Sequence, residues 1–267
     1  MKFGFIKVMA ASPKLKVGDT AYNLESAREC FDEAERVGAN LLVFPELHLT
    51  AYTCGDLFYS DTLLDGALEA LEALRDYTSG KRCMAVIGVP VRTGGKLYNC
   101  AAVIQNGAVL GVVPKTVLPN YGEFYEKRQF SSGADYRGEN TIRIAGWDVP
   151  FGRDLLFCCR EMPDFVLGVE ICEDLWYRSH AVDRAVSCGG NGDSEPLGFE
   201  RADREKRLQT AAGVVCIVAA HLRLCICERG AWRIHAGHGL LRAQPYIRKR
   251  TASCGEEALC KKRAYRD

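Results

Sequence analysis

The sequence of 267 residues lacks a long hydrophobic run, which excludes a helical membrane span. No apolar stretch reaches the roughly 18 residues that such a span needs, so we expect no membrane partner. The first residues also lack the pattern of a secretory signal peptide, because Lys7 interrupts what would be its apolar core. We therefore expect a cytoplasmic protein that begins with a strand at residues 4–9.

The sequence also lacks a large excess of charge of either sign. It has 35 Lys and Arg against 34 Asp and Glu, and 48% of its residues are hydrophobic. This composition is typical of a soluble globular protein and excludes collagen-like, disordered and coiled-coil classes. The 13 cysteines are an odd number in a chain without a secretory signal, so we interpret them as reduced thiols.

The small net charge conceals two regions of different composition. Residues 1–176 carry 18 Lys and Arg against 24 Asp and Glu, whereas residues 177–267 carry 17 against 10. Arginine alone rises from 10 in the longer first region to 13 in the shorter second one. The sequence therefore predicts a boundary near Trp176.

Helix and strand patterns alternate along the first region. Apolar spacing predicts a helix that is capped by Asn23 and reaches Val37, and a second helix over residues 63–74. The Asn106-Gly107 pair predicts a hairpin turn. Apolar runs predict strands at residues 4–9, 41–44, 84–90, 97–105, 108–113 and 165–171. This order indicates an α/β fold, with a sheet covered by helices on at least one face.

Three polar residues follow predicted strands. They are Glu46, Lys115 and Cys172, and ligand sites of α/β sheets gather where strands end. Together they would supply a thiol nucleophile, a carboxylate that takes and returns its proton, and an ammonium that stabilises an oxyanion. Each of them alone is more often a structural or solvated residue, so the spacing by itself does not decide between the two interpretations.

Longer segments around these residues resemble a known family. Residues 44–58, 115–130 and 168–176 are similar to the three motifs of the nitrilase superfamily, in which Glu, Lys and Cys follow in this order. The extended matches resemble the glutaminase domains of glutamine-dependent NAD synthetases more closely than generic nitrilases. The resemblance covers residues 1 to about 176. It implies an αββα sandwich, which would be incomplete here.

The resemblance implies a role for each matched residue. Cys172 would attack the side-chain amide of L-glutamine, and Glu46 would act as general base and then return the proton to the departing ammonia. Lys115, with backbone amides near Cys172, would hold the oxyanion. Its ammonium would also lower the pKa of the Cys172 thiol, so we expect Cys172 to be the thiol of residues 1–176 that is most readily alkylated at neutral pH. Glu126 would orient the lysine. Tyr121 and Phe124 would wall the glutamine pocket.

The resemblance also implies partners for a larger assembly. In the full family protein, a synthetase domain uses ATP and Mg²⁺ to amidate deamido-NAD with the released ammonia, and the family forms homo-oligomers. The glycine-rich pyrophosphate loop of that domain does not occur in this sequence. We expect no cofactor and no metal in the glutaminase domain itself.

Residues 177–267 do not continue the family pattern. Cys225, Cys227, His235 and His238 suggest a zinc site, but one residue between the cysteines and two between the histidines are too few for the usual zinc spacings. The excess of arginine suggests nucleic acid, yet the arginines follow no helical face and lack interleaved aromatic residues. We expect neither partner, and we expect a disordered, non-homologous tail that adds no strand to the sheet.

A change of reading frame explains the tail better. Legal codons for residues 191–205, read from their second base, can give Thr-Val-Ile-Leu-Asn-Leu-Ser-Ala-Ser-Asn-Glu-Leu-Thr-Gly, which resembles the missing family strand and substrate loop. The same offset over residues 222–242 and 251–259 also gives family-like segments. The hypothesis is a glutaminase domain that is out of frame after about residue 176, with impaired activity.

Two other hypotheses stay open from the sequence. The chain could be a free-standing nitrilase-type amidase, although such enzymes lack the extended matches at residues 52–58 and 121–130. It could also be a non-catalytic interaction protein whose basic, cysteine-rich tail binds metal or nucleic acid.

Overall fold

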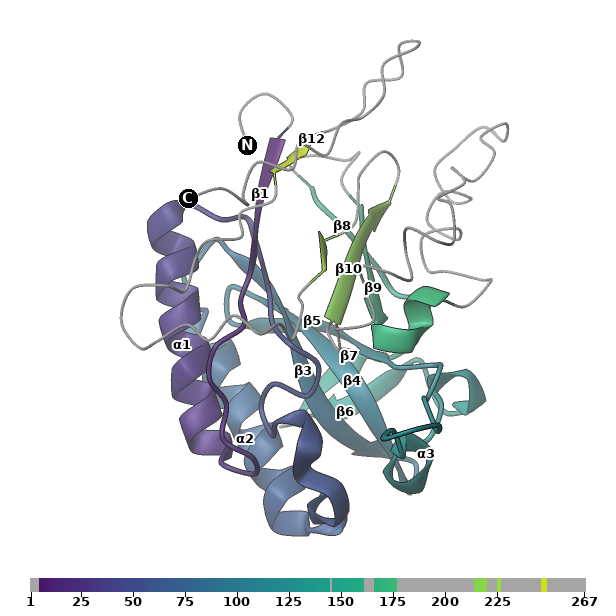
Figure 1. The fold of residues 1–267 in the computed structure, drawn as a ribbon. Coiled ribbons are helices and arrows are strands. Elements are labelled where there is room, and N and C mark those ends of the chain that lie inside the picture. The colour runs from purple at the N-terminus through teal and green to yellow at the C-terminus, as the bar shows by residue number, and fades with distance from the viewer. Residues whose placement is uncertain are drawn as a thin grey trace, which may run out of the picture.

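The computed structural model describes residues 5–144, 146–160, 166–176, 214–219, 225–226 and 246–248. In it, one pair of helices and two sheets lie in successive layers (Figure 1). None of the helices in this part of the chain combines the length and apolar character that a membrane span requires.

The first sheet has six strands in the order β12-β1-β2-β3-β4-β5. Strands β1, β2 and β3 run parallel, and β3, β4 and β5 form an antiparallel meander whose β4–β5 turn is Asn106-Gly107, as predicted. Both turn residues have positive φ, which suits this pair to a tight hairpin. The bounds are β1 (Phe5–Ala10), β2 (Leu41–Val43), β3 (Met84–Thr93), β4 (Lys96–Gln105), β5 (Ala108–Pro114) and β12 (Tyr246–Arg248).

Helices α1 (Thr20–Val37) and α2 (Asp61–Tyr77) cover one face of this sheet (Figure 1). Their apolar faces bury Phe31, Leu71 and Leu74 in one cluster with the β3 and β4 side chains that face them. The predicted cap of α1 is wrong, because the helix begins one turn earlier, at Thr20. Asp19 is the cap and accepts a hydrogen bond from the Tyr22 amide at 3.0 Å, whereas Asn23 lies inside the helix.

The second sheet packs on the other face of the first. It has the order β11-β10-β9-β8, with bounds β8 (Leu156–Cys158), β9 (Val166–Ile171), β10 (Val214–Ala219) and β11 (Cys225–Ile226). Leu167, Val169 and Ile171 of β9 are buried in one cluster with Val43 and Val86 of the first sheet. The layers are therefore helix, sheet, sheet, which confirms the predicted α/β class.

Three strands come from the region predicted to contribute none. Strand β10 pairs antiparallel with β9 from Val214↔Ile171 to Ala219↔Val166, and β12 pairs with β1. The expectation that no part of residues 177–267 joins a sheet is therefore wrong. The apolar run that begins at Val214 supplies residues suited to a strand. The remaining residues of the predicted tail lie outside the described part.

The sequence patterns missed several smaller elements of the first region. Strands β6 (Thr141–Ile144) and β7 (Trp147–Pro150) form a separate two-stranded hairpin. Short helical turns connect the strands, and they are η1 (Tyr52–Tyr59), α3 (Glu126–Gln129), η2 (Gly133–Asp135) and η3 (Cys172–Trp176). The loops that carry the candidate site include η1, α3 and η3.

Candidate active site

Glu46 lies in the loop that follows β2, and its side chain is fully buried. The loop crosses directly over Gly88 of β3, where an added Cβ would be 2.1 Å from the Leu47 nitrogen and 2.6 Å from the Pro45 oxygen. Only glycine allows two backbone segments to approach this closely. Gly88 is thus the residue that lets the strand bring the Glu46 carboxylate into the sheet layer.

Lys115 follows β5 directly and is also fully buried. Its backbone nitrogen donates to the Asn99 carbonyl of β4 at 2.8 Å, and its own carbonyl accepts from the Gly133 nitrogen at 2.8 Å. Its Nζ donates to Oε1 of Glu46 and to Oε1 of Glu126, each at 2.7 Å. The structure thus brings together three residues that the resemblance matched, from positions up to 80 residues apart in sequence.

Glu126 begins α3, and only 3% of its surface is exposed. Its Oε1 also accepts a hydrogen bond from the Tyr52 hydroxyl at 2.7 Å. Burial and the negative charge of Glu46 raise the pKa of Glu126 to about 7, against the opposing effects of Lys115 and Tyr52. One buried ammonium therefore faces two buried carboxylates.

This balance keeps the lysine charged. Burial disfavours the ammonium, but the negative charges of Glu46, Cys172 and Glu126 outweigh burial and raise the pKa of Lys115. A permanently charged donor is the group that a developing oxyanion requires.

Cys172 lies at the end of β9, where η3 begins. Its φ is +50°, a left-handed conformation that is uncommon for residues other than glycine and is often found at functional positions. The thiol is partly buried and interacts electrostatically with Glu46, Lys115 and Glu126. The three residues predicted to be catalytic therefore lie at one site.

The expectation that the ammonium lowers the pKa of this thiol is wrong. Burial and then Glu46 raise the pKa of Cys172 to about 12, and the favourable effect of Lys115 does not compensate. Preferential alkylation of Cys172 at neutral pH therefore has no support, since Cys158 is exposed. A thiol of this kind becomes nucleophilic only when a base takes its proton during attack.

Asp174 connects the Cys172 turn to the Lys115 segment. It is 8% exposed, and its Oδ1 accepts from the Thr116 hydroxyl at 2.6 Å and from the backbone nitrogens of Thr116 and Val117 at 3.0 and 2.7 Å. Its Oδ2 accepts from the Ile171 nitrogen at 3.3 Å. One buried carboxylate thus fixes the position of the residue after Lys115 relative to the residue before Cys172.

The two predicted pocket residues lie beside this site. Tyr121 is exposed and its hydroxyl donates to Glu173, the residue after Cys172. The Phe124 ring lies 5.8 Å from the Tyr121 ring and 6.5 Å from the Tyr52 ring. These aromatic side chains form a continuous row from the Glu126 side of the site to the Cys172 side.

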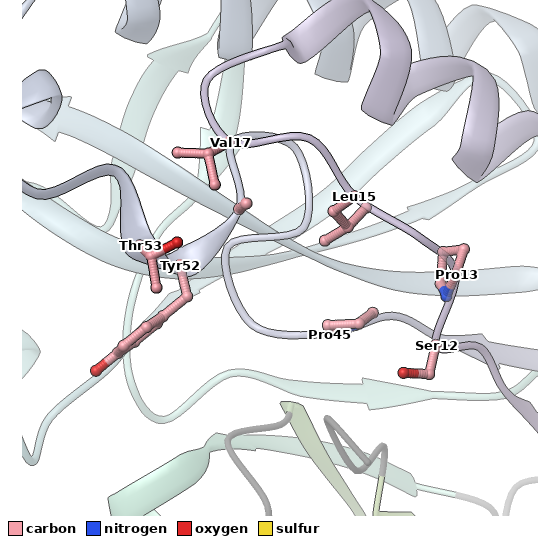
Figure 2. Close-up of a pocket in the computed structure, with 8 residues that line it drawn as sticks. Ser12, Pro13, Leu15, Val17, Pro45, Tyr52 and Thr53 are labelled. Carbon is pink, nitrogen blue, oxygen red and sulfur yellow. The ribbon is translucent and has the colours of Figure 1, made fainter. Parts of the chain in front are cut away.

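A pocket of about 240 Å³ lies beside the segment that follows β2 and carries Glu46, but the candidate catalytic residues do not line it. Neither Glu46 nor Lys115 nor Cys172 lines it, although Pro45 and Tyr52 come from the loop that carries Glu46 (Figure 2). We therefore do not identify this pocket with the substrate position. Its lining residues are Ser12, Pro13, Leu15, Val17, Pro45, Ala51, Tyr52 and Thr53.

His48 connects the loop after β2, which also carries Glu46, to helix α1. It is fully buried, its Nε2 lies 3.2 Å from the Asn23 carbonyl, and its ring packs on Phe44 at 4.7 Å. The carbonyl requires a protonated Nε2, so the neutral ring fits this environment. Burial lowers the pKa of His48 to about 4, although the hydrogen bond to Asn23 opposes this.

We expect His48 to make the protein less stable as the pH falls. The unfolded chain binds a proton at His48 below about pH 6.5, and the folded chain does so only near pH 4, so the free energy of unfolding decreases between these values. The full loss is about 3 kcal/mol. Urea unfolding of the parent and of His48→Gln, whose amide can still donate to Asn23, measures this loss. Equal pH dependence in the two proteins would contradict it.

No group of His, Cys, Asp and Glu in the described ranges is arranged to hold a metal ion. The Cys225, Cys227, His235 and His238 set, which the sequence analysis judged too closely spaced for zinc, lies outside the residues whose side chains are described. Three residues of the site, Asn99, Tyr52 and Asp174, were not predicted from the sequence. A sequence signal existed for Asn99, because it is a polar residue inside an otherwise apolar strand.

The site and fold agree with a comparison to known families. The model of the carbon-nitrogen hydrolase family matches residues 8–187, so this chain belongs to that family and thereby to the nitrilase superfamily. Among curated relatives, the glutamine-dependent NAD(+) synthetase of Mycobacterium tuberculosis (strain ATCC 25618 / H37Rv) is 42% identical over 224 residues. The glutamine-dependent NAD(+) synthetase of Thermotoga maritima is 32% identical over 171 residues.

The matches to this chain span between about a quarter and a third of the length of these relatives. The match to the mycobacterial protein covers 81% of this chain and 32% of the relative, and the match to the Thermotoga protein covers 64% and 26%. Since 81% of 267 residues is about 216, the similarity extends beyond Trp176. The resemblance therefore covers more of the chain than the three motifs indicate.

Solved structures show the same fold. A glutamine-dependent NAD(+) synthetase from Cytophaga hutchinsonii superposes with a TM-score of 0.61 at 23% identity, covering 81% of this chain and 39% of that one. The glutamine-dependent NAD+ synthetase from Acinetobacter baumannii, solved with ADP, gives a TM-score of 0.51 at 26% identity, covering 77% and 35%. The predicted nitrilase-type fold is thereby confirmed.

Proposed function

We propose that this chain hydrolyses the side-chain amide of L-glutamine to glutamate and ammonia, with Cys172 as the nucleophile. The observation that carries the proposal is the buried hydrogen-bonded set of Glu46, Lys115 and Glu126 next to a thiol of raised pKa. The names of the curated relatives support glutamine as the substrate.

The thiol proton passes to Glu46 as the sulfur attacks the amide carbon, and Lys115 stabilises the negative charge that develops on the amide oxygen. The carbon–nitrogen bond then breaks, and the proton moves from Glu46 to the departing nitrogen, which leaves as ammonia. Water hydrolyses the resulting glutamyl thioester and restores the thiol. Every step uses side chains of this chain and no cofactor.

We further propose that the ammonia serves to amidate deamido-NAD. The ATP- and Mg²⁺-dependent step would take place in a part of the relatives' length that this chain does not span. Formation of a homo-oligomer stays a prediction.

The test traps the intermediate on its cysteine. The purified chain is incubated with glutamine, acid-quenched and digested, and mass spectrometry should find a glutamyl adduct on the Cys172 peptide together with release of glutamate. A Cys158→Ser variant is the matched control, because Cys158 is an exposed thiol of the same sheet and its loss should leave the adduct unchanged. Hydrolysis of simple aliphatic amides but not of glutamine would contradict the substrate. An adduct on another cysteine would contradict the nucleophile.

A further inference from the structure

Asn99 of β4 is a buried polar residue that contacts both Glu46 and Lys115. It is 1% exposed, and its backbone carbonyl accepts a hydrogen bond from the Lys115 backbone nitrogen at 2.8 Å. Its side-chain Nδ2 donates to Oε1 of Glu46 at 2.6 Å. A single residue thus holds the backbone of the lysine and the side chain of the carboxylate.

The two oxygens of Glu46 differ because of these contacts. Oε1 accepts from Asn99 Nδ2 and from Lys115 Nζ, at 2.6 and 2.7 Å. Oε2 is buried and has no hydrogen-bond partner among the described residues. Two donors occupy the lone pairs of Oε1, so an incoming proton binds Oε2.

We propose that Asn99 is a positioning residue that selects Oε2 of Glu46 as the atom that takes the Cys172 proton. The inference rests on the proposed amide hydrolysis. The sulfur–hydrogen bond breaks, its electron pair stays on sulfur, and the proton goes to Oε2. It later passes from Oε2 to the departing nitrogen.

Lys115 alone does not enforce this orientation. Its ammonium is shared with Glu126, and a carboxylate near one ammonium can rotate to present both of its oxygens to it. Such a rotation would place Oε2 on the lysine, and Glu46 would then have no oxygen free of hydrogen bonds to take the proton. The Asn99 amide prevents it with a neutral donor, which adds no charge to a site that already holds Glu46, Glu126, Lys115, Cys172 and the Tyr52 hydroxyl.

The first test is Asn99→Asp, which keeps the size of the side chain and removes the donor except when the new carboxyl is protonated. We expect kcat for glutamine hydrolysis to fall about a hundredfold at pH 8 with KM changed less than threefold, and to recover as the pH falls and the new carboxyl gains its proton. The control is Gln105→Glu, the same change of amide to acid at the outer end of the same strand. Parent-like kcat and pH profile in Asn99→Asp would overturn the inference.

A second pair of variants tests the inference if Asn99→Asp does not fold. Asn99→Ser keeps a hydroxyl donor and Asn99→Ala does not, so Asn99→Ser should be at least tenfold more active. Equal activity would overturn the inference.

If the parent chain hydrolyses no glutamine, the proposed function is contradicted. The role of Asn99 can still be tested by a second measurement. The readout is then the alkylation rate of Cys172 by iodoacetamide, followed by mass spectrometry. Loss of the oriented base should slow alkylation of Cys172 about tenfold in Asn99→Ala and less in Asn99→Ser, while Cys158 is unaffected. Identical Cys172 rates in the parent and both variants would overturn the inference.

Discussion

Replacing Glu46 with glutamine is expected to lower kcat for glutamine hydrolysis by a factor of about 10²–10⁴, the range for loss of a general acid–base group. The substitution keeps the shape of the side chain and an oxygen that can accept from Asn99 and Lys115, so the local structure should persist. What is lost is the atom that takes the thiol proton. Burial is the largest cause of the raised pKa of Cys172 and persists in the variant, so little thiolate is expected at neutral pH without that base.

Steady-state kinetics of the parent and of Glu46→Gln measure this effect, with the thermal unfolding temperature as a check on folding. Glu123→Gln is the matched control, because Glu123 is an exposed carboxylate in the loop between Tyr121 and Glu126. We expect its kcat to equal that of the parent. A kcat in Glu46→Gln within threefold of the parent would exclude Glu46 as the general base.

The layers of the fold could be predicted because the signals that define them are local. Strands β2, β3 and β4 each contain a continuous apolar run, and a run that is buried on both faces can be identified without information from elsewhere in the chain. The β4–β5 turn was predicted from two residues. The start of α1 was misjudged because Asp19 and Asn23 are both good caps, and the choice depends on contacts from Asn23 to Lys16 and Leu49.

The candidate catalytic residues of the site could be predicted from the sequence, but the pKa of its thiol could not. Glu46, Lys115 and Cys172 were identified from motifs, whereas the pKa of Cys172 was predicted in the wrong direction. A neighbouring ammonium lowers a thiol pKa only if its charge is not already balanced. Here Lys115 is hydrogen bonded to two carboxylates, those of Glu46 and Glu126, so its charge is already balanced.

Asn99 illustrates why positioning residues escape sequence reasoning. It lies 53 positions from Glu46, within a strand pattern that is otherwise apolar. Its function depends on the pairing of β4 with β5, which brings the Asn99 carbonyl to Lys115. No spacing rule along the chain contains that information.

We expect the activity of the chain to depend on the origin of residues 177–267. We propose that these residues are read out of frame after the part of the chain that carries the three motifs. The change from a surplus of acidic to a surplus of basic residues near Trp176 supports this, and so do the family-like segments in the offset frame. The extension of the relatives' match beyond Trp176, and the pairing of β10 with β9, argue for a tail that belongs to the fold.

A one-base correction near the Trp176 codon is therefore expected to raise kcat/KM for glutamine hydrolysis by at least about a hundredfold. The segments recovered in the offset frame resemble those that hold the substrate in the family, and a displacement of about 1 Å in a bound substrate can cost that factor. Glutamate release is measured for the chain as it stands, for the corrected chain, and for the corrected chain with Cys172→Ala. We expect the activity gained by the correction to disappear with Cys172→Ala, because the thiol is the attacking atom. Equal activity of the original and corrected chains would show that residues 177–267 complete the domain as they are, with β10 as a genuine strand of its second sheet.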